Sequence, residues 1–182
     1  FIFLSSMSAY GIIKKKILFE SYKPYKLNSY GKSKIECEKL LINYSKITKT
    51  PYIIIRLPGV VGLGSHSNFI TEITKKIFKN EKIIVSNKND FFNNIVFIDD
   101  LSKYILKIIK TKKFRYNLIN LASKNKLKIS NLINFIYEKL KIKNKKIIWV
   151  KNKKKSFTIN LNKASQNGYS SSSVKKSLEN YI

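Results

Sequence analysis

Short apolar runs alternate along this chain with longer segments in which apolar residues recur at helical spacing. The apolar runs predict strands over 1–5, 52–57, 83–85, 95–98, 117–121 and 147–150. The periodic segments predict helices over 29–46, 68–79, 101–110 and 131–140, with two short helices in the tail 162–181. Because strands alternate with helices, the sequence predicts an α/β fold with a parallel sheet.

The first strand and the first helix carry candidate chemistry. The run FIFLSS ends in Ser5 and Ser6 and is typical of a buried parallel strand whose carboxyl end faces a site. The helix begins at the good capping pair 28–29 and carries Tyr30 and Lys34 on one face. An ammonium beside a phenol favours the phenolate. Alone, this spacing is also typical of a solvated helix face in a lysine-rich chain, but the adjacent strand end favours a proton-transfer site.

Several motifs together resemble one family, the extended short-chain dehydrogenase/reductases, and within it the NAD-dependent epimerases and dehydratases. FIFLSSMSAYG (1–11) is similar to the strand with the family's catalytic serine, and YGKSK (30–34) matches its Tyr-x-x-x-Lys signature. YIIIRLPGVVGLG (52–64) resembles the next strand and its glycine-bearing exit loop. Further likenesses follow in the family's order: NIVFIDDLSKYIL (94–106), YNLINLAS (116–123) and the ending 163–182.

The resemblance implies roles for the residues of this site. Tyr30 would be the base that takes a proton from a sugar hydroxyl while hydride passes to NAD or NADP, and Lys34 would support it and bind the nicotinamide ribose. Ser6 would hydrogen-bond the reacting oxygen, with Ser5 as the alternative if the register differs by one. The cofactor would contact Tyr30, Lys34, Pro58 and Ser5, and the substrate would contact Ser6, Gly59 and Asn68.

The family's first strand, its glycine-rich dinucleotide turn and its acidic ribose ligand have no counterpart before Phe1. The glycines of 59–64 follow a strand, but no helix opens directly from them, so they do not replace that turn. We therefore expect an N-terminally truncated family member that is inactive alone. Its predicted parts are the C-terminal portion of a Rossmann-like domain, 1–62, with 93–110 packed back on it, and a smaller α/β substrate-binding lobe, 63–182.

Two departures from the family bear on the substrate. Many sugar epimerases carry Asn where Gly59 stands and Arg near Asn93, so their mode of holding the diphosphate is in doubt here. Dehydratases commonly carry an acid after the serine, where this chain has Met7-Ser8. The predicted activity of the full-length parent is therefore that of an epimerase or reductase of a nucleotide sugar, serving polysaccharide synthesis. The alternative is a noncatalytic or degraded fragment of the same fold.

The net charge of +27 invites a different interpretation, a nucleic-acid-binding protein. However, the cations are lysines apart from Arg56 and Arg115, whereas readers of nucleic acid favour arginine. The lysines are scattered, with modest clusters at 14–16, 143–146 and 151–155, which is typical of a solvated surface. This interpretation ranks last, and we expect no specific nucleic-acid partner.

The remaining chemistry is sparse. A single cysteine, Cys37, predicts a packing residue in a reducing compartment such as the cytoplasm, and His66 has no partners at metal-ligand spacing. Asp100 and Ser130 are predicted as helix caps. The apolar runs are too short to span a bilayer, so we expect no membrane partner. For the full-length form we expect a homodimer.

Overall fold

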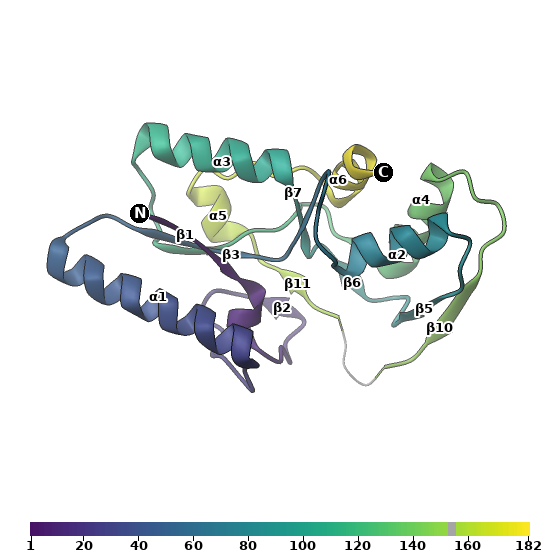
Figure 1. The fold of residues 1–182 in the computed structure, drawn as a ribbon, viewed down its shortest axis with the longest axis horizontal. Coiled ribbons are helices and arrows are strands. Elements are labelled where there is room, and N and C mark those ends of the chain that lie inside the picture. Colours follow the sequence, from purple (N-terminus) through teal and green to yellow (C-terminus); the bar gives the residue numbers. More distant parts are fainter. Residues whose placement is uncertain (153–155) are drawn as a thin grey trace.

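A three-stranded parallel sheet forms the centre of one half of the molecule (Figure 1). The structure is a computed structural model that describes residues 1–152 and 156–182. The strands of the sheet are β1 (Ile2–Ser6), β3 (Ile53–Leu57) and β8 (Leu118–Asn120), in the order β1-β3-β8. Ile2 pairs with Ile53 and Ile54 with Leu118. Residues 153–155 of the predicted lysine cluster lie outside the described residues.

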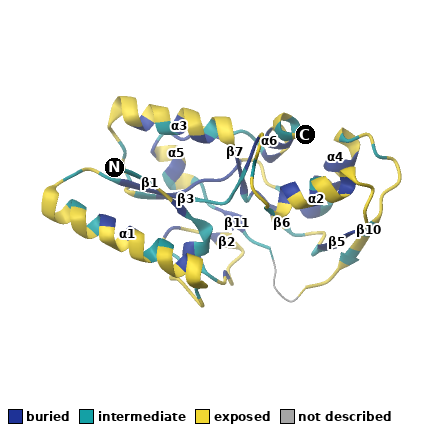
Figure 2. Ribbon diagram, in the orientation of Figure 1, coloured by how far each residue is buried: buried dark blue, intermediate teal, exposed yellow. Residues whose placement is uncertain are grey.

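Helices cover both faces of this sheet. Helix α1 (Ser29–Thr48) lies on one face, and α3 (Ile98–Thr111) and α5 (Asn162–Gln166) lie on the other (Figure 1). Because successive side chains of a strand point to opposite faces, Ile53 and Ile55 pack into the core under α3, while Arg56 points toward α1. The outer surfaces of α1 and α3 are exposed (Figure 2).

The other half of the molecule is built mainly from helices around a second core. Helices α2 (Phe69–Phe78), α4 (Ile129–Lys139) and α6 (Val174–Tyr181) bury their apolar faces together. Strand β5 (Ile83–Ser86) pairs in parallel with β10 (Ile147–Val150) beside them. The amphipathic spacing of each helix explains its burial, since Ile70, Ile73 and Ile77 of α2 all point inward.

Short elements connect the two halves. Strand β4 (Gly59–Val61) continues from β3 and pairs in parallel with β7 (Ile95–Phe97), which leads into α3. The other short elements are the 3-10 helix η1 (Met7–Tyr10) and the strand pairs β2 (Ile17–Leu18) with β11 (Thr158–Ile159) and β6 (Phe91–Phe92) with β9 (Leu127–Lys128). The sequence predicted β7 but not β4, η1 or the strands β2, β11, β6 and β9.

The predicted fold class, α/β with a parallel Rossmann-like sheet and a smaller α/β part, is confirmed. The longer helices begin and end within a few residues of their predicted bounds. The division into 1–62 and 63–182 stays a prediction. Strand β8 and helix α5 come from the second segment, yet they belong to the first sheet and its core.

Four finer expectations are wrong. Cys37 is exposed rather than packed, because α1 turns only a narrow face to the sheet. Ser130 lies inside α4, whose N-cap is Lys128. Asp100 lies in the first turn of α3 and accepts hydrogen bonds from the backbone and hydroxyl of Ser172, so it fastens the C-terminal segment instead of capping a helix. In β1 only Ser5 is buried, because β3 is the one strand that pairs with β1 in the part of the chain the structure describes.

None of the helices in the described ranges is both long and apolar enough to cross a membrane.

The start of α1 is held against η1 by a close contact at Gly31. A Cβ built on Gly31 would lie 2.3 Å from the Ser8 carbonyl oxygen, a backbone atom. Replacing glycine by alanine inside a helix ordinarily raises the free energy of unfolding by about 1 kcal/mol. Because the new Cβ would collide with the Ser8 carbonyl, we expect the opposite change at Gly31. We predict that Gly31→Ala destabilises the chain by about 1–3 kcal/mol, measured by thermal or denaturant unfolding.

The neighbouring exposed Lys32 offers a matched control on the same helix turn. Lys32→Ala should change stability by less than about 0.5 kcal/mol. A Gly31→Ala chain as stable as the parent would show that α1 does not approach η1 this closely.

Candidate active site

One cavity of about 560 Å³ opens at the carboxyl ends of β1 and β3. Its wall includes every residue that the sequence predicted for the site: Ser5, Ser6, Tyr30, Lys34, Pro58, Gly59 and Asn68. These residues come from two strand ends, the first turns of α1 and the N-cap of α2, which lie far apart in the sequence. The volume is in the range of cavities that hold small molecules.

The tyrosine and the lysine of α1 reach the cavity from one helix face. Asn28 caps the helix, its side-chain oxygen accepting from the Gly31 N–H at 2.7 Å, so the predicted cap is confirmed. The Lys34 ammonium lies 5.6 Å from the centre of the Tyr30 ring and donates to the Leu4 carbonyl at 3.2 Å. Tyr30 itself is 53% exposed, so its hydroxyl can meet a ligand.

The two serines at the end of β1 differ in their partners. The Ser5 hydroxyl is buried and donates to the Glu38 carboxylate at 2.5 Å. Ser6 is half-buried, and its oxygen accepts from the Ser8 N–H at 3.1 Å. The Ser6 proton therefore has no acceptor recorded within the described residues, and this hydroxyl is the better placed of the two to donate to a ligand.

The opposite wall of the cavity is formed by the exit of β3 and the start of α2. A Cβ on Gly59 would lie 3.2 Å from the Asn68 side chain, so the loop and the helix cap pack closely. The Asn68 oxygen accepts from the N–H groups of residues 70 and 71, and its amide donates to the Val60 and His66 carbonyls. This side chain is thus engaged, and a ligand would meet the N-terminal end of α2 instead.

A buried ion pair lies beneath the site. Glu38 follows Lys34 by one helix turn, and its carboxylate accepts from the Nε and Nη2 of Arg56 on β3 at 2.9 and 2.6 Å. Both side chains are 6% exposed. With the Ser5 hydroxyl on the same carboxylate, the pair joins α1, β1 and β3 at the point where they form the cavity.

The network continues away from the cavity through aromatic and amide groups. The Arg56 guanidinium lies 4.3 Å from the ring centre of Tyr10, whose hydroxyl donates to Asn120 at 2.7 Å. Burial raises the pKa of the Tyr10 hydroxyl, although Arg56 opposes this. Burial alone would lower the pKa of Arg56, but Glu38 and Tyr10 together raise it above its usual value. Arg56 is therefore a permanent cation in the interior.

Sequence reasoning did not find this ion pair, although two signals were present. Arg56 interrupts the apolar run 52–57, and it is one of two arginines in the chain. Glu38 stands at i+8 from Tyr30 and so shares its helix face. A buried charge in a strand requires a partner, and Glu38 was the nearest acidic residue on that helix face.

The described residues contain no group of three or more histidine, cysteine, aspartate or glutamate side chains that could hold a metal ion. The cavity wall offers hydroxyls, the Lys34 ammonium, backbone groups and apolar side chains such as Leu4, Leu57 and Ile98, and it also includes His66 and Asn68. This set suits proton transfer and the binding of a flat organic ring.

The sequence matches a family model over residues 1–122, that of the NAD dependent epimerase/dehydratase family. Because the match covers more than half of the chain and the motifs line one cavity, the chain belongs to this family. The resemblance drawn from the motifs is thereby confirmed. No curated protein matches the chain.

Solved structures share the fold. UDP-glucuronic acid 4-epimerase from Bacillus cereus in complex with NAD superposes with a TM-score of 0.79 at 21% identity, over 99% of this chain and 57% of that chain. UDP-glucose 4-epimerase from Thermotoga maritima with UDP-glucose gives 0.78 at 18%, over 99% and 61%. RMD from Pseudomonas aeruginosa complexed with NADPH gives 0.75 at 16%, over 99% and 64%.

The chain thus spans about three fifths of the length of these solved structures. The predicted cofactor class, NAD or NADP, is confirmed for the family, which is NAD-dependent and whose solved relatives hold NAD or NADPH.

Proposed function

We propose that this chain is the catalytic and substrate-binding part of an NAD(P)-dependent enzyme that epimerises or reduces a nucleotide sugar, with Tyr30 as the base. The observation that carries the proposal is the single cavity that brings Ser6, Tyr30 and Lys34 together with the loop 58–59 and the N-terminus of α2. The relatives that share this fold act on UDP-sugars or hold NAD or NADPH, which supports the same class for this chain.

The cavity fits the nicotinamide end of the cofactor. Leu4, Leu57 and Pro58 offer apolar surface for a ring, and the Lys34 ammonium is a donor for ribose hydroxyls. Within the described residues no glycine-rich turn opens into a helix beside this cavity, so the pyrophosphate would be held by a portion present in a longer form of the chain. When bound, the cofactor supplies the acceptor for hydride.

The residues of the chain would manage the proton. A sugar hydroxyl placed between Tyr30 and Ser6 would give its proton to the Tyr30 oxygen as the carbon–hydrogen bond breaks and the carbonyl forms. The Lys34 ammonium lies on the same helix face, 5.6 Å from the centre of the Tyr30 ring, so it would lie beside the groups that exchange the proton. The Ser6 hydroxyl would donate to the reacting oxygen and keep it in position. For an epimerisation, the reverse steps would return hydride to the opposite face of the sugar carbonyl, while the Tyr30 oxygen gives the proton back to the carbonyl oxygen.

Features around the cavity favour an epimerase or reductase over a dehydratase. Met7 and Ser8, in the place of an acidic pair, lie in η1 beside the site, so no carboxylate stands there for eliminating water. Asn93, near the place where many epimerases carry arginine, is buried and exchanges two hydrogen bonds with the backbone of Ile159. A diphosphate would therefore be held by other groups than in those enzymes.

We also propose a cellular role, a location and an oligomeric state for the enzyme. A role in polysaccharide synthesis and a cytoplasmic location accord with a nucleotide-sugar substrate and a single, exposed cysteine. A homodimer of the longer form is supported by the exposed apolar residues Leu40, Tyr44 and Ile47, which follow one another at helical spacing along α1.

The proposal is tested by comparing the 182-residue chain with a longer form that includes the rest of a nicotinamide-binding domain. With the longer form, NADH fluorescence should change saturably, and incubation with UDP-hexoses should yield the C4 epimer or a reduced sugar, measured by chromatography. The 182-residue chain should give neither signal, because its described residues contain no glycine-rich turn that could hold the pyrophosphate. If the longer form binds NADH but transforms no nucleotide sugar, the noncatalytic interpretation is correct.

A further inference from the structure

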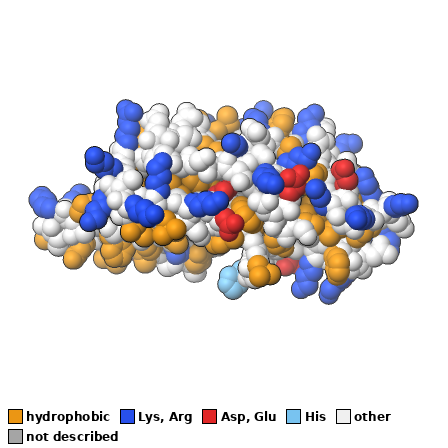
Figure 3. All heavy atoms as spheres, turned by 90° about the horizontal axis from the view of Figure 1, so that it is seen from above, with side chains coloured by type: hydrophobic (Ala, Val, Ile, Leu, Met, Phe, Trp, Pro, Cys, Tyr) orange, Lys and Arg blue, Asp and Glu red, His pale blue; other side chains and the backbone are white. Residues whose placement is uncertain are grey.

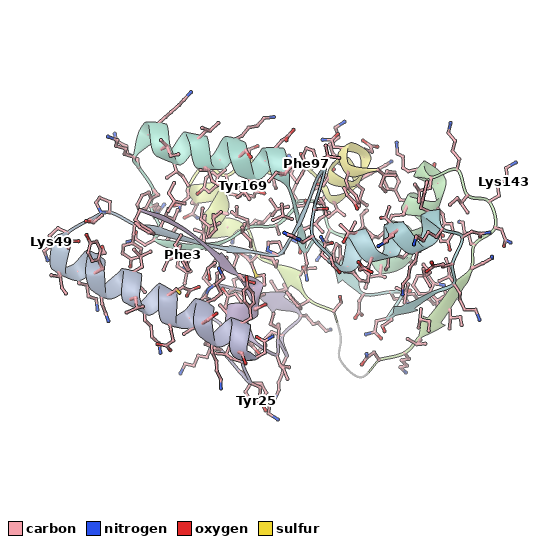
Figure 4. The ribbon with its side chains drawn as sticks, viewed as in Figure 1. Phe3, Tyr25, Lys49, Phe97, Lys143 and Tyr169 are labelled. Atoms are coloured by element: carbon pink, nitrogen blue, oxygen red, sulfur yellow. The ribbon has the colours of Figure 1, made fainter. Side chains whose placement is uncertain are left out.

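A second cavity, of about 610 Å³, shares no lining residue with the candidate active site. It opens between α3, the turn at Lys124-Asn125 and the segment 168–173 that leads into α6. Tyr169, which is labelled in Figure 4, belongs to this segment. Its ring packs edge-on against that of Tyr104 of α3, with ring centres 5.2 Å apart. The floor of the cavity is therefore part of the protein core.

Four lysines surround this cavity: Lys103, Lys107, Lys124 and Lys176. Lys103 and Lys124 form no salt bridge with any described residue, and Lys107 donates to the Gly168 carbonyl, which leaves its charge uncompensated. Lys176 lies 3.7 Å from Glu179, which has a second lysine, Lys139, at the same distance. The ammonium groups thus outnumber the acids that could neutralise them.

The acidic residue of the lining, Asp100, is already engaged. Its two carboxylate oxygens accept from the Ser172 N–H at 2.7 Å and from the Ser172 hydroxyl at 3.1 Å. These bonds fix the serine segment across the cavity, and parallel backbone bonds between Lys124 and residues 172 and 174 fix its far end. The site is therefore a preformed cavity and not a loose group of surface lysines.

Hydroxyl groups complete the lining. Ser170, Ser171 and Ser173 contribute to it, and Ser173 caps α6, so the positive end of that helix lies at the cavity edge. Tyr104, in the same lining, is buried, and burial raises the pKa of its hydroxyl to about 12, so this side chain adds no charge to the cavity.

We propose that this cavity binds a small anion that carries two or more phosphate groups. Lysine ammonium groups bind phosphate as point charges, and several of them around one rigid cavity match closely spaced phosphates. Hydroxyls of the serine segment supply the directional hydrogen bonds. A polymer such as nucleic acid would instead engage lysines over a wide surface, and Figure 3 shows lysine and arginine side chains spread over the face seen from above.

The test is a calorimetric titration of the chain with inorganic tripolyphosphate at low and at physiological salt. We expect saturable binding at one site, and we expect Lys103→Gln combined with Lys124→Gln to weaken it by about tenfold or more. Both lysines are exposed, so this variant should fold like the parent. The matched control removes two other exposed charges, Lys75→Gln with Lys143→Gln, and should leave the affinity within about twofold.

Amide chemical shifts locate the ligand independently. The shifts on adding tripolyphosphate should concentrate on the segment 168–173 and on Lys124, and leave α2 unchanged. Equal weakening in the control variant, shifts spread over the whole chain, or no saturable binding at physiological salt would each overturn the proposal and point to unspecific attraction by net charge. None of these outcomes bears on the nucleotide-sugar activity, because no active-site residue is altered.

Discussion

Replacing Tyr30 by phenylalanine in the longer, cofactor-binding form should lower turnover of the nucleotide sugar by about 10²–10⁴-fold, the usual contribution of a positioned acid or base. The substitution removes one oxygen from a side chain that is 53% exposed, so packing should hardly change. The loss should fall on kcat, since Tyr30 acts on the proton that moves in the transition state. NADH binding should persist, because Lys34 and the loop after β3 remain.

Tyr44 provides the control for this experiment. It lies on the same helix and is 55% exposed, but it does not line the cavity. Tyr44→Phe should leave kcat and KM within about twofold of the parent value. If Tyr30→Phe turns over substrate at the parent rate, Tyr30 is not the base. If Tyr30→Phe loses turnover and also fails to bind NADH, the loss is explained by cofactor binding and not by proton transfer.

The elements that form this site were predictable because each carries a local signal. Asn28 caps the helix, the four-residue spacing places Tyr30 beside Lys34, and the apolar runs ending at Ser6 and Leu57 predict parallel strands. Parallel strands end at one edge of a sheet, so their exits meet. The α/β class follows from such patterns, whereas Pro58, Gly59 and Asn68 were predicted as site residues from the family resemblance.

The parts that were missed depend on contacts between distant segments. Strands of two residues, such as those at 17–18 and 158–159, have no periodicity of their own and exist because the chain brings them together. Asp100 reads as a helix cap in the sequence, whereas its partner Ser172 lies 72 residues away. Cys37 is exposed because α1 buries few side chains, which its pattern alone does not show.

The second large effect concerns the ion pair that holds α1 to the sheet. Glu38→Gln keeps the size of the side chain but leaves the Arg56 guanidinium buried without its counter-charge. Removing one partner of a buried pair typically costs about 3–5 kcal/mol. For a chain of this size each kcal/mol corresponds to about 2–4 °C, so unfolding should occur roughly 10 °C lower in a thermal melt followed by circular dichroism.

Glu36→Gln is the matched control, because Glu36 lies two residues earlier on α1 in an exposed pair with Lys39. Such pairs contribute about 1 kcal/mol at most, so this variant should melt close to the parent. If Glu38→Gln and Glu36→Gln unfold at the same temperature, Glu38 does not form the ion pair with Arg56.

A double substitution distinguishes two roles of the Glu38–Arg56 pair, one in stability and one in positioning the active site. Glu38→Leu with Arg56→Met removes both charges, and apolar replacements of buried pairs are often neutral or stabilising. We expect this variant to recover most of the stability lost in Glu38→Gln. The carboxylate that accepts from Ser5 would still be missing, so the end of β1 would be linked to α1 only through the hydrogen bond from Lys34 to the Leu4 carbonyl among the bonds described above. In the longer form, a stable double variant with reduced kcat would therefore show that the pair positions Tyr30 and Ser6, whereas full activity would limit its role to stability.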